Sequence, residues 1–173
     1  MTTQTRRTRT YVAFDGDTDL MSYRTIQGWS ADPNNSFSLN DAHELTNARD
    51  DSLPESIINQ LKPRLDASKH LLLIIGSSTN TNRKGILQYE LRYALRNSLP
   101  IFLVFKGYDD ANTKHGDSLW KALEPKIPAT IRNADKADKY CLVMPFTRAR
   151  VSSAVKGWSN SNPPGAGYTW HWA

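Results

Sequence analysis

The sequence has few cysteines, few histidines and no long apolar run, and each shortage excludes a class of protein. Its single cysteine, Cys141, has no partner for an internal disulfide. The four histidines are scattered without the spacing of metal ligands, so no metal site is predicted. No apolar stretch approaches the roughly 20 residues that span a bilayer, and the polar N-terminus is not followed by the apolar h-region of a signal peptide. We therefore expect a cytoplasmic protein with no membrane partner.

The chain also has little excess charge once its first residues are set aside. It carries 22 Lys and Arg against 17 Asp and Glu, a net charge of +5. Arg6, Arg7 and Arg9 supply three of these charges, which leaves +2 for residues 10–173. No RNP, zinc-finger or helix-turn-helix signature accompanies the remaining charge. Nucleic acid is therefore not expected as the principal partner.

What the chain does contain is a regular alternation of short apolar runs and amphipathic segments. Strands are predicted at residues 10–14, about 36–40, 70–76, 101–105 and 140–144. Helices are predicted at about 18–30, 55–65, 85–98, 119–123 and 147–157, with Pro63 kinking or breaking the second. This alternation predicts an α/β domain over residues 10–157, built on a flavodoxin-like parallel five-stranded sheet in the order 2-1-3-4-5 with helices on both faces.

Two tails flank the predicted domain. Residues 1–9 are polar and basic, and we expect a flexible segment there. Residues 158–173 are rich in Trp, Pro and Gly without helical or strand periodicity. This C-terminal tail is expected to pack against the domain or to form a self-association surface.

Polar residues follow several of the predicted strands, where ligands bind in such folds. The strand order reverses between the first and third strands, and ligands occupy the crevice beyond their carboxyl ends. The candidate ligand-binding residues at this edge are Phe14, Asp15, Gly16, Asn40, Asp41, Ser77 and Thr79. Helix capping by the aspartates and serines, and turn formation by Asn40 and Asp41, are structural alternatives for the same residues.

Five segments, taken in order, carry a resemblance to a known family. They are YVAFDGDTD, FSLND, HLLLIIGSST, ILQYELRYAL and LPIFLVF, within about residues 9–106. Together they resemble the TIR-like family that includes the ThsB proteins of Thoeris anti-phage defence. The resemblance implies cleavage of NAD, which is then a substrate and not a cofactor, by the glutamate of the Tyr-Glu-Leu helix. That glutamate is Glu90, and the implied product is an ADP-ribose-derived signalling nucleotide that acts on a downstream effector.

A carboxylate suits this reaction because the bond to nicotinamide breaks through an oxocarbenium-like state, which a poorly hydrated anion stabilises. Alternatively, Glu90 is a solvent-facing helical residue that pairs with Arg83 or Arg92. NAD-cleaving TIR domains commonly carry Trp four residues before the glutamate, where this chain has Ile86. That departure favours a second hypothesis, a TIR-like module that binds a nucleotide or protein without turnover.

A phosphatase of the haloacid-dehalogenase type is a further alternative. Asp15 and Asp17 would form its Asp-x-Asp motif, with Ser77 as the second-motif hydroxyl and Asp109-Asp110 as the acidic pair. Asp19 stands where that family carries Thr or Val, and Lys106 lies on the wrong element for the expected lysine. The TIR-like hypothesis fits more of the chain.

Overall fold

The fold centres on a five-stranded parallel sheet in the order β2-β1-β3-β4-β5, as predicted. The computed structural model describes residues 8–35, 37–39, 55–82, 85–108, 118–134 and 141–157. The strands are β1 (Thr8–Ala13), β2 (Phe37–Leu39), β3 (His70–Ile75), β4 (Ile101–Phe105) and β5 (Cys141–Pro145). Every residue of β3, β4 and β5 is buried, as expected for strands covered on both faces.

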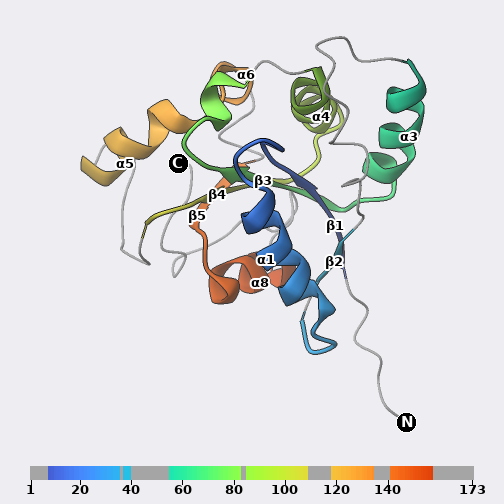
Figure 1. Ribbon diagram of the computed structural model, residues 1–173, viewed down its shortest axis with the longest axis horizontal. Coiled ribbons are helices and arrows are strands. Elements are labelled where there is room, and N and C mark those ends of the chain that lie inside the picture. The colour runs from blue at the N-terminus through green and yellow to red at the C-terminus, as the bar shows by residue number, and fades with distance from the viewer. Residues whose placement is uncertain are drawn as a thin grey trace.

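Helices cover both faces of the sheet (Figure 1). On one face lie α1 (Leu20–Ala31) and α8 (Arg148–Gly157). The opposite face is covered by α3 (Glu55–Asp66), α4 (Gly85–Arg96), α5 (Ser118–Leu123) and α6 (Ala129–Arg132). Two short 3-10 turns, η1 (Thr79–Thr81) and η2 (Glu124–Lys126), complete the described elements.

The two faces of the sheet form separate hydrophobic clusters, because successive strand residues point to opposite sides. Tyr11 and Ala13 of β1 belong to the cluster under α3 and α4. Val12 and Phe14 belong to the cluster under α1 and α8. This alternation decides which residues near β1 meet Glu90 and which do not.

Three local predictions were wrong. The first strand begins at Thr8, so Thr8 and Arg9 pair with β2 and do not belong to the flexible segment expected over residues 1–9. The first helix begins at Leu20 and not near Thr18, because Thr18 and Asp19 donate their N–H groups to the Asp15 carbonyl and form a turn. In addition, α3 continues through Pro63 to Asp66. Proline removes one backbone donor, but this one lies in the last turn of α3, and its carbonyl accepts the Ala67 N–H at 3.1 Å.

Several predictions concern residues outside the described ranges. These are Asn40, Asp41, the acidic pair Asp109-Asp110, residues 1–7 and the tail 158–173. Within the described ranges, no helix is long and apolar enough to cross a membrane.

Candidate active site

Glu90 points into the protein interior and not to solvent. It lies in the middle of α4, and 2% of its surface is exposed. Its Oε1 atom accepts a hydrogen bond from the Tyr11 hydroxyl at 2.5 Å, across 79 residues of sequence. The alternative of a solvent-facing Glu90 paired with an arginine is therefore wrong. The sequence placed Glu90 beside inward-facing Leu91, and this proximity to the buried face explains the outcome.

Burial makes Glu90 an unusual carboxyl group. Loss of hydration raises its pKa from 4.5 to about 8, while the hydrogen bond from Tyr11 acts in the opposite direction. Glu90 is therefore mostly neutral at pH 7 in this state. A carboxyl group with so perturbed a pKa is a typical mark of a functional site.

Tyr11 is a site residue that the sequence did not single out. It lies on β1, is fully buried, and donates to Glu90. A usable signal was present, since a tyrosine hydroxyl requires a hydrogen-bond partner when the strand that carries it is buried. The sequence left that partner undetermined because the contact depends on how α4 packs over β1.

Two predicted substrate contacts lie on opposite sides of the sheet: Ile86 on the same side as Glu90, and Phe14 on the other. Ile86 is half-buried, one helical turn before Glu90 and therefore nearer the start of α4. Phe14 lies on the opposite face of the sheet, where its ring stacks on Tyr23 with centroids 4.7 Å apart. The structure thus brings Ile86 to the Glu90 side and keeps Phe14 in the other layer.

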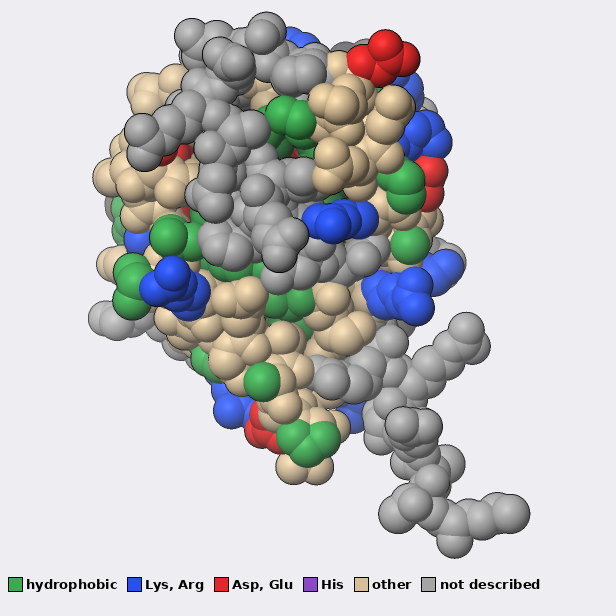
Figure 2. All heavy atoms as spheres, turned by 45° about the vertical axis from the view of Figure 1, so that its right-hand side comes forward, with side chains coloured by type: hydrophobic (Ala, Val, Ile, Leu, Met, Phe, Trp, Pro, Cys, Tyr) green, Lys and Arg blue, Asp and Glu red, His purple; other side chains and the backbone are tan. Residues whose placement is uncertain are grey.

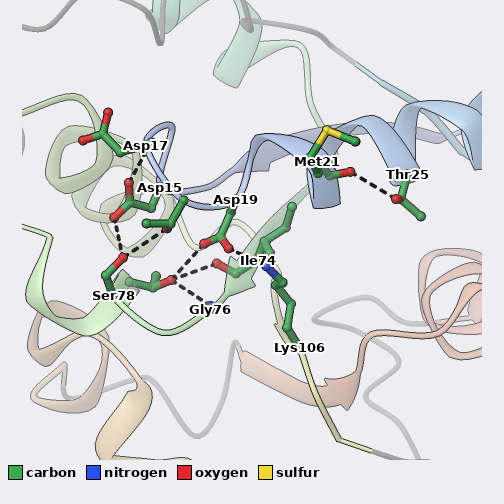
Figure 3. A network of polar contacts seen from close by, with 11 residues as sticks. Asp15, Asp17, Asp19, Met21, Thr25, Ile74, Gly76, Ser78 and Lys106 are labelled. Carbon is green, nitrogen blue, oxygen red and sulfur yellow. Dashed lines mark hydrogen bonds and ion pairs between the residues drawn. The ribbon is translucent and has the colours of Figure 1, made fainter.

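A second polar cluster lies at the carboxyl ends of β1 and β3, where the strand order reverses (Figure 3). Asp15 accepts the Asp17 N–H at 3.0 Å and the Ser78 hydroxyl at 3.1 Å. The Lys106 ammonium donates to Asp19 Oδ1 at 2.8 Å. Asp15 and Asp19 are 5% and 1% exposed, so both carboxylates are internal. We call this group the carboxyl-edge network.

Thr79 belongs to the same network and has an internal role. It is fully buried, and its hydroxyl accepts the Gly76 N–H at 2.9 Å while lying 3.4 Å from Asp19 Oδ2. Asp19 makes no side-chain cap to α1, because its oxygens face Lys106 and Thr79. Asp15 and Thr79, both predicted as ligand contacts, are thus brought together, with their described bonds directed to the protein.

Gly76 permits this close packing. A Cβ atom at this position would lie 2.4 Å from Asp19 Oδ1 and 2.7 Å from Oδ2, far inside contact distance. The Asp19 carboxylate is held by Lys106, so it has little freedom to move away. The glycine of the Gly-Ser-Ser-Thr sequence is therefore required for the approach of α1 to the end of β3.

Ser77 lines a small pocket of about 320 Å³ at the ends of β3 and β4. The pocket also contains Lys106, Lys126 and the backbone of Gly76 and Gly107. Ser77 and Gly107 are exposed, and both lysines are half-exposed. The Lys126 ammonium and the Ser77 hydroxyl suit an anion such as phosphate, whereas the Lys106 ammonium is already paired with Asp19. Gly16, in the preceding loop after β1, is exposed.

Among the described residues, no group of three or more His, Cys, Asp or Glu side chains is arranged to hold a metal ion. The phosphatase alternative is weakened in another way, because Lys106 is committed to Asp19 and Ser78, not Ser77, bonds to Asp15. What the fold and site define is a doubly wound α/β domain with one neutral, buried glutamate against its first strand.

Comparison with known sequences gives this domain a family. The profile described as Thoeris protein ThsB, TIR-like domain, matches residues 11–111, which include both Tyr11 and Glu90. The chain belongs to this TIR-like family, as its sequence motifs predicted, and membership supports a role in Thoeris defence.

Other comparisons add less. A similar solved structure is that of a conserved protein from Enterococcus faecalis V583, with 14% sequence identity and a TM-score of 0.46. The match covers 87% of this chain and 98% of that chain. No curated protein matches the sequence.

Proposed function

We propose that this chain cleaves NAD between nicotinamide and ribose and converts the ADP-ribosyl group into a signalling nucleotide that acts on a downstream effector. One observation carries the proposal: Glu90, in the family's Tyr-Glu-Leu helix, is a buried carboxyl group held by a single tyrosine hydroxyl. NAD is the substrate in this proposal, and no resident cofactor is needed.

The reaction requires only one carboxylate because the leaving group is already charged. The bond from ribose C1′ to the pyridinium nitrogen breaks, and both electrons leave with nicotinamide, which departs neutral. The positive charge moves to the ribose ring, where ionised Glu90 stabilises it. Water or another acceptor then gives an electron pair to C1′ and loses a proton.

Glu90 must lose its own proton before it acts. Its pKa of about 8 leaves it mostly neutral in the free protein at pH 7. The Tyr11 hydroxyl lowers this pKa by donating to the ionised form. The pyridinium charge of bound NAD would favour the same ionised form, so the substrate promotes ionisation of the group that stabilises the ribosyl cation.

Substrate positioning is part of the same proposal. Ile86 is proposed to contact NAD one helical turn from Glu90, and Ser77 with Lys126 to receive its diphosphate. Gly16, in the exposed loop after β1, allows close backbone approach. Asn40 and Asp41, which lie outside the described residues, stay in the proposed set of substrate contacts. Phe14, Asp15 and Thr79 are not included, because Phe14 lies in the other layer and the other two are buried and bonded within the protein.

The test is release of nicotinamide by purified protein incubated with NAD. Glu90→Gln keeps the shape and removes the charge, so we expect a loss of at least about 100-fold. Glu55→Gln, an exposed glutamate on α3, should leave release unchanged. If the protein needs an infection signal, the same comparison is made in infected-cell lysate. Equal release by wild type and Glu90→Gln under both conditions would overturn the assignment.

A non-catalytic TIR-like module is the alternative function. Two observations favour it: Ile86 replaces the tryptophan common in NAD-cleaving relatives, and Glu90 is 2% exposed. Such a module would bind NAD or a related nucleotide, measurable by calorimetry, without releasing nicotinamide. In that case Ile86→Trp should change affinity without creating turnover.

A further inference from the structure

The described surface offers grooves and few large apolar patches. Met21, at 70%, is the strongly exposed large hydrophobic residue among those described. In Figure 2 the Lys and Arg side chains are dispersed, with hydrophobic side chains visible in small areas. A groove of about 970 Å³ runs along the outer side of α4, between α3 and α6. We call it the α4 groove; its charged and aromatic lining residues are Lys62, Asp66, Tyr89, Arg92, Tyr93 and Arg96.

The α4 side of this groove has a regular pattern. Tyr89, Arg92, Tyr93 and Arg96 follow one another at helical spacings of three, one and three residues, so they share one face of α4. The two tyrosine rings lie with centroids 6.3 Å apart and planes at 39°. Glu90 points from the same helix toward β1. The groove is therefore separate from the candidate active site.

The charge of the groove is set by its two arginines. On the α3 wall, Lys62 and Asp66 pair at 2.7 Å and neutralise each other. Arg92 and Arg96 are exposed and make no ion pair within the described part of the chain. Like charges four residues apart destabilise a helix by a few tenths of a kcal/mol. The pattern therefore has a small cost in the isolated protein and suits an anionic ligand.

The aromatic rings narrow the class of anion. An acidic peptide would use the arginines but has no need of tyrosine rings between them. A nucleotide strand uses both, because phosphates bind guanidinium groups and bases stack on aromatic side chains. The groove is also polar where α6 meets α4. There the hydroxyl of Thr130, on α6, donates to Oε1 of Gln88, on α4, at 2.5 Å, and both residues line the groove.

We propose that the α4 groove binds single-stranded nucleic acid, with Arg92 and Arg96 on adjacent phosphates and Tyr89 and Tyr93 against bases. The overall charge of the chain argued against such a partner because it is a sum over the whole sequence. The groove instead gathers aromatic rings along one helix face together with two arginines that pair with no acidic group among the described residues. This binding does not depend on NAD cleavage.

The experiment measures fluorescence anisotropy of a labelled DNA or RNA strand of about ten nucleotides. At low salt we expect saturable binding by the full chain. Arg92→Gln with Arg96→Gln should weaken it by about tenfold or more and reduce the slope of log affinity against log salt by about 1.4, since each lost phosphate contact on a single strand removes about 0.7. Tyr93→Ala should weaken binding at all salt concentrations without changing that slope.

The matched control is Arg24→Gln with Lys156→Gln, which removes the same charge from exposed positions on α1 and α8. It should leave affinity within about twofold. An equal loss in the control, or no binding at low salt, would overturn the proposal. Inorganic triphosphate and a glutamate-rich peptide serve as competitors. Displacement by either at the same concentration as unlabelled strand would show that bases are not recognised, which also overturns it.

Discussion

Glu90 and Asp19 are buried to nearly the same degree, at 2% and 1% exposed, yet their surroundings differ completely. Glu90 faces one tyrosine hydroxyl and no cation within the described residues. Asp19 is bonded to the Lys106 ammonium and lies next to the Thr79 hydroxyl. Burial alone therefore does not decide what a carboxyl group does in this protein.

The difference separates a reactive carboxyl group from a structural one. Without a nearby cation, loss of hydration raises the pKa of Glu90 to about 8. Such a group gains most from a cationic ligand, which supplies the charge partner that Glu90 does not have among the described residues. Asp19 already has that partner, so its carboxylate holds α1 against the ends of β3 and β4. The partners, more than the exposure, make Glu90 the candidate catalytic group.

The largest expected effect is a gain in the free energy of unfolding when Glu90 is replaced by the neutral side chain of glutamine. Below pH 4.5 Glu90 is protonated in both folded and unfolded states and has no pH-dependent effect. Between pH 4.5 and 8 the unfolded chain ionises first, so the folded state loses stability as pH rises, by as much as about 5 kcal/mol above pH 8. In urea unfolding, the stability of Glu90→Gln relative to wild type should therefore increase between pH 5 and pH 8.5.

The control for this measurement is Glu55→Gln, which alters an exposed glutamate at the start of α3. The difference in free energy of unfolding between this variant and wild type should be the same at pH 5 and at pH 8.5. If Glu90→Gln behaves in the same way, Glu90 is not the poorly hydrated carboxyl group described above, and the contrast with Asp19 fails.

Gly76→Ala tests the carboxyl-edge network through its closest packing. The added Cβ would meet the Asp19 carboxylate at 2.4 Å, so we expect a loss of about 2–3 kcal/mol in the free energy of unfolding. Gly28→Ala is the matched control, because nothing lies within 4 Å of its Cβ position on α1. That change should stabilise the protein by about 1 kcal/mol. Equal effects at the two glycines would contradict the close approach at Asp19.

Tyr11→Phe tests Glu90, the other carboxyl group of the comparison. Loss of the hydroxyl removes the one described bond that favours ionised Glu90, so the pKa of Glu90 rises. The rise of kcat/KM with pH, which reports the free enzyme, should then move to higher pH, with about a tenfold loss at pH 7. Tyr23→Phe removes a buried hydroxyl on the other face, where it accepts from Gln27, and should leave that profile in place. Identical profiles for both variants would exclude Tyr11 as a positioning residue.

Much of the fold was predictable because its signals are local. The apolar runs at residues 70–76 and 101–105 are buried strands, and the alternation of strands and helices predicted the observed sheet order. The turn before α1 was less predictable. Asp15, Asp17 and Asp19 are all residue types that cap helices. The sequence does not show that the Asp19 carboxylate bonds to Lys106 and makes no side-chain cap to α1. The short helix α6 has four residues, too few for a visible period.

The site was predictable by residue but not by geometry. Family motifs placed Glu90 and Ile86 on one helix, and the structure retains that arrangement. Tyr11 was missed because its partner is 79 residues away. Phe14 was predicted as a ligand contact at the carboxyl end of the first strand, but strand alternation places it in the other layer from Glu90. Predicting which side chains meet requires the register of β1 under α4, which no local pattern encodes.

The smallest expected effect compares two lysine–carboxylate pairs. Lys106–Asp19 joins a half-exposed ammonium to a buried carboxylate, whereas both members of Lys62–Asp66 are about half exposed. In a double-mutant cycle with Asp19→Asn and Lys106→Met, we expect a coupling of about 1 kcal/mol, limited by the solvent that reaches Lys106. The corresponding cycle at Lys62 and Asp66 should give about 0.3–0.5 kcal/mol and fall further in high salt. Equal couplings would mean that solvent screens both pairs to the same extent. Burial of the Asp19 carboxylate would then not strengthen its ion pair beyond that of a surface carboxylate.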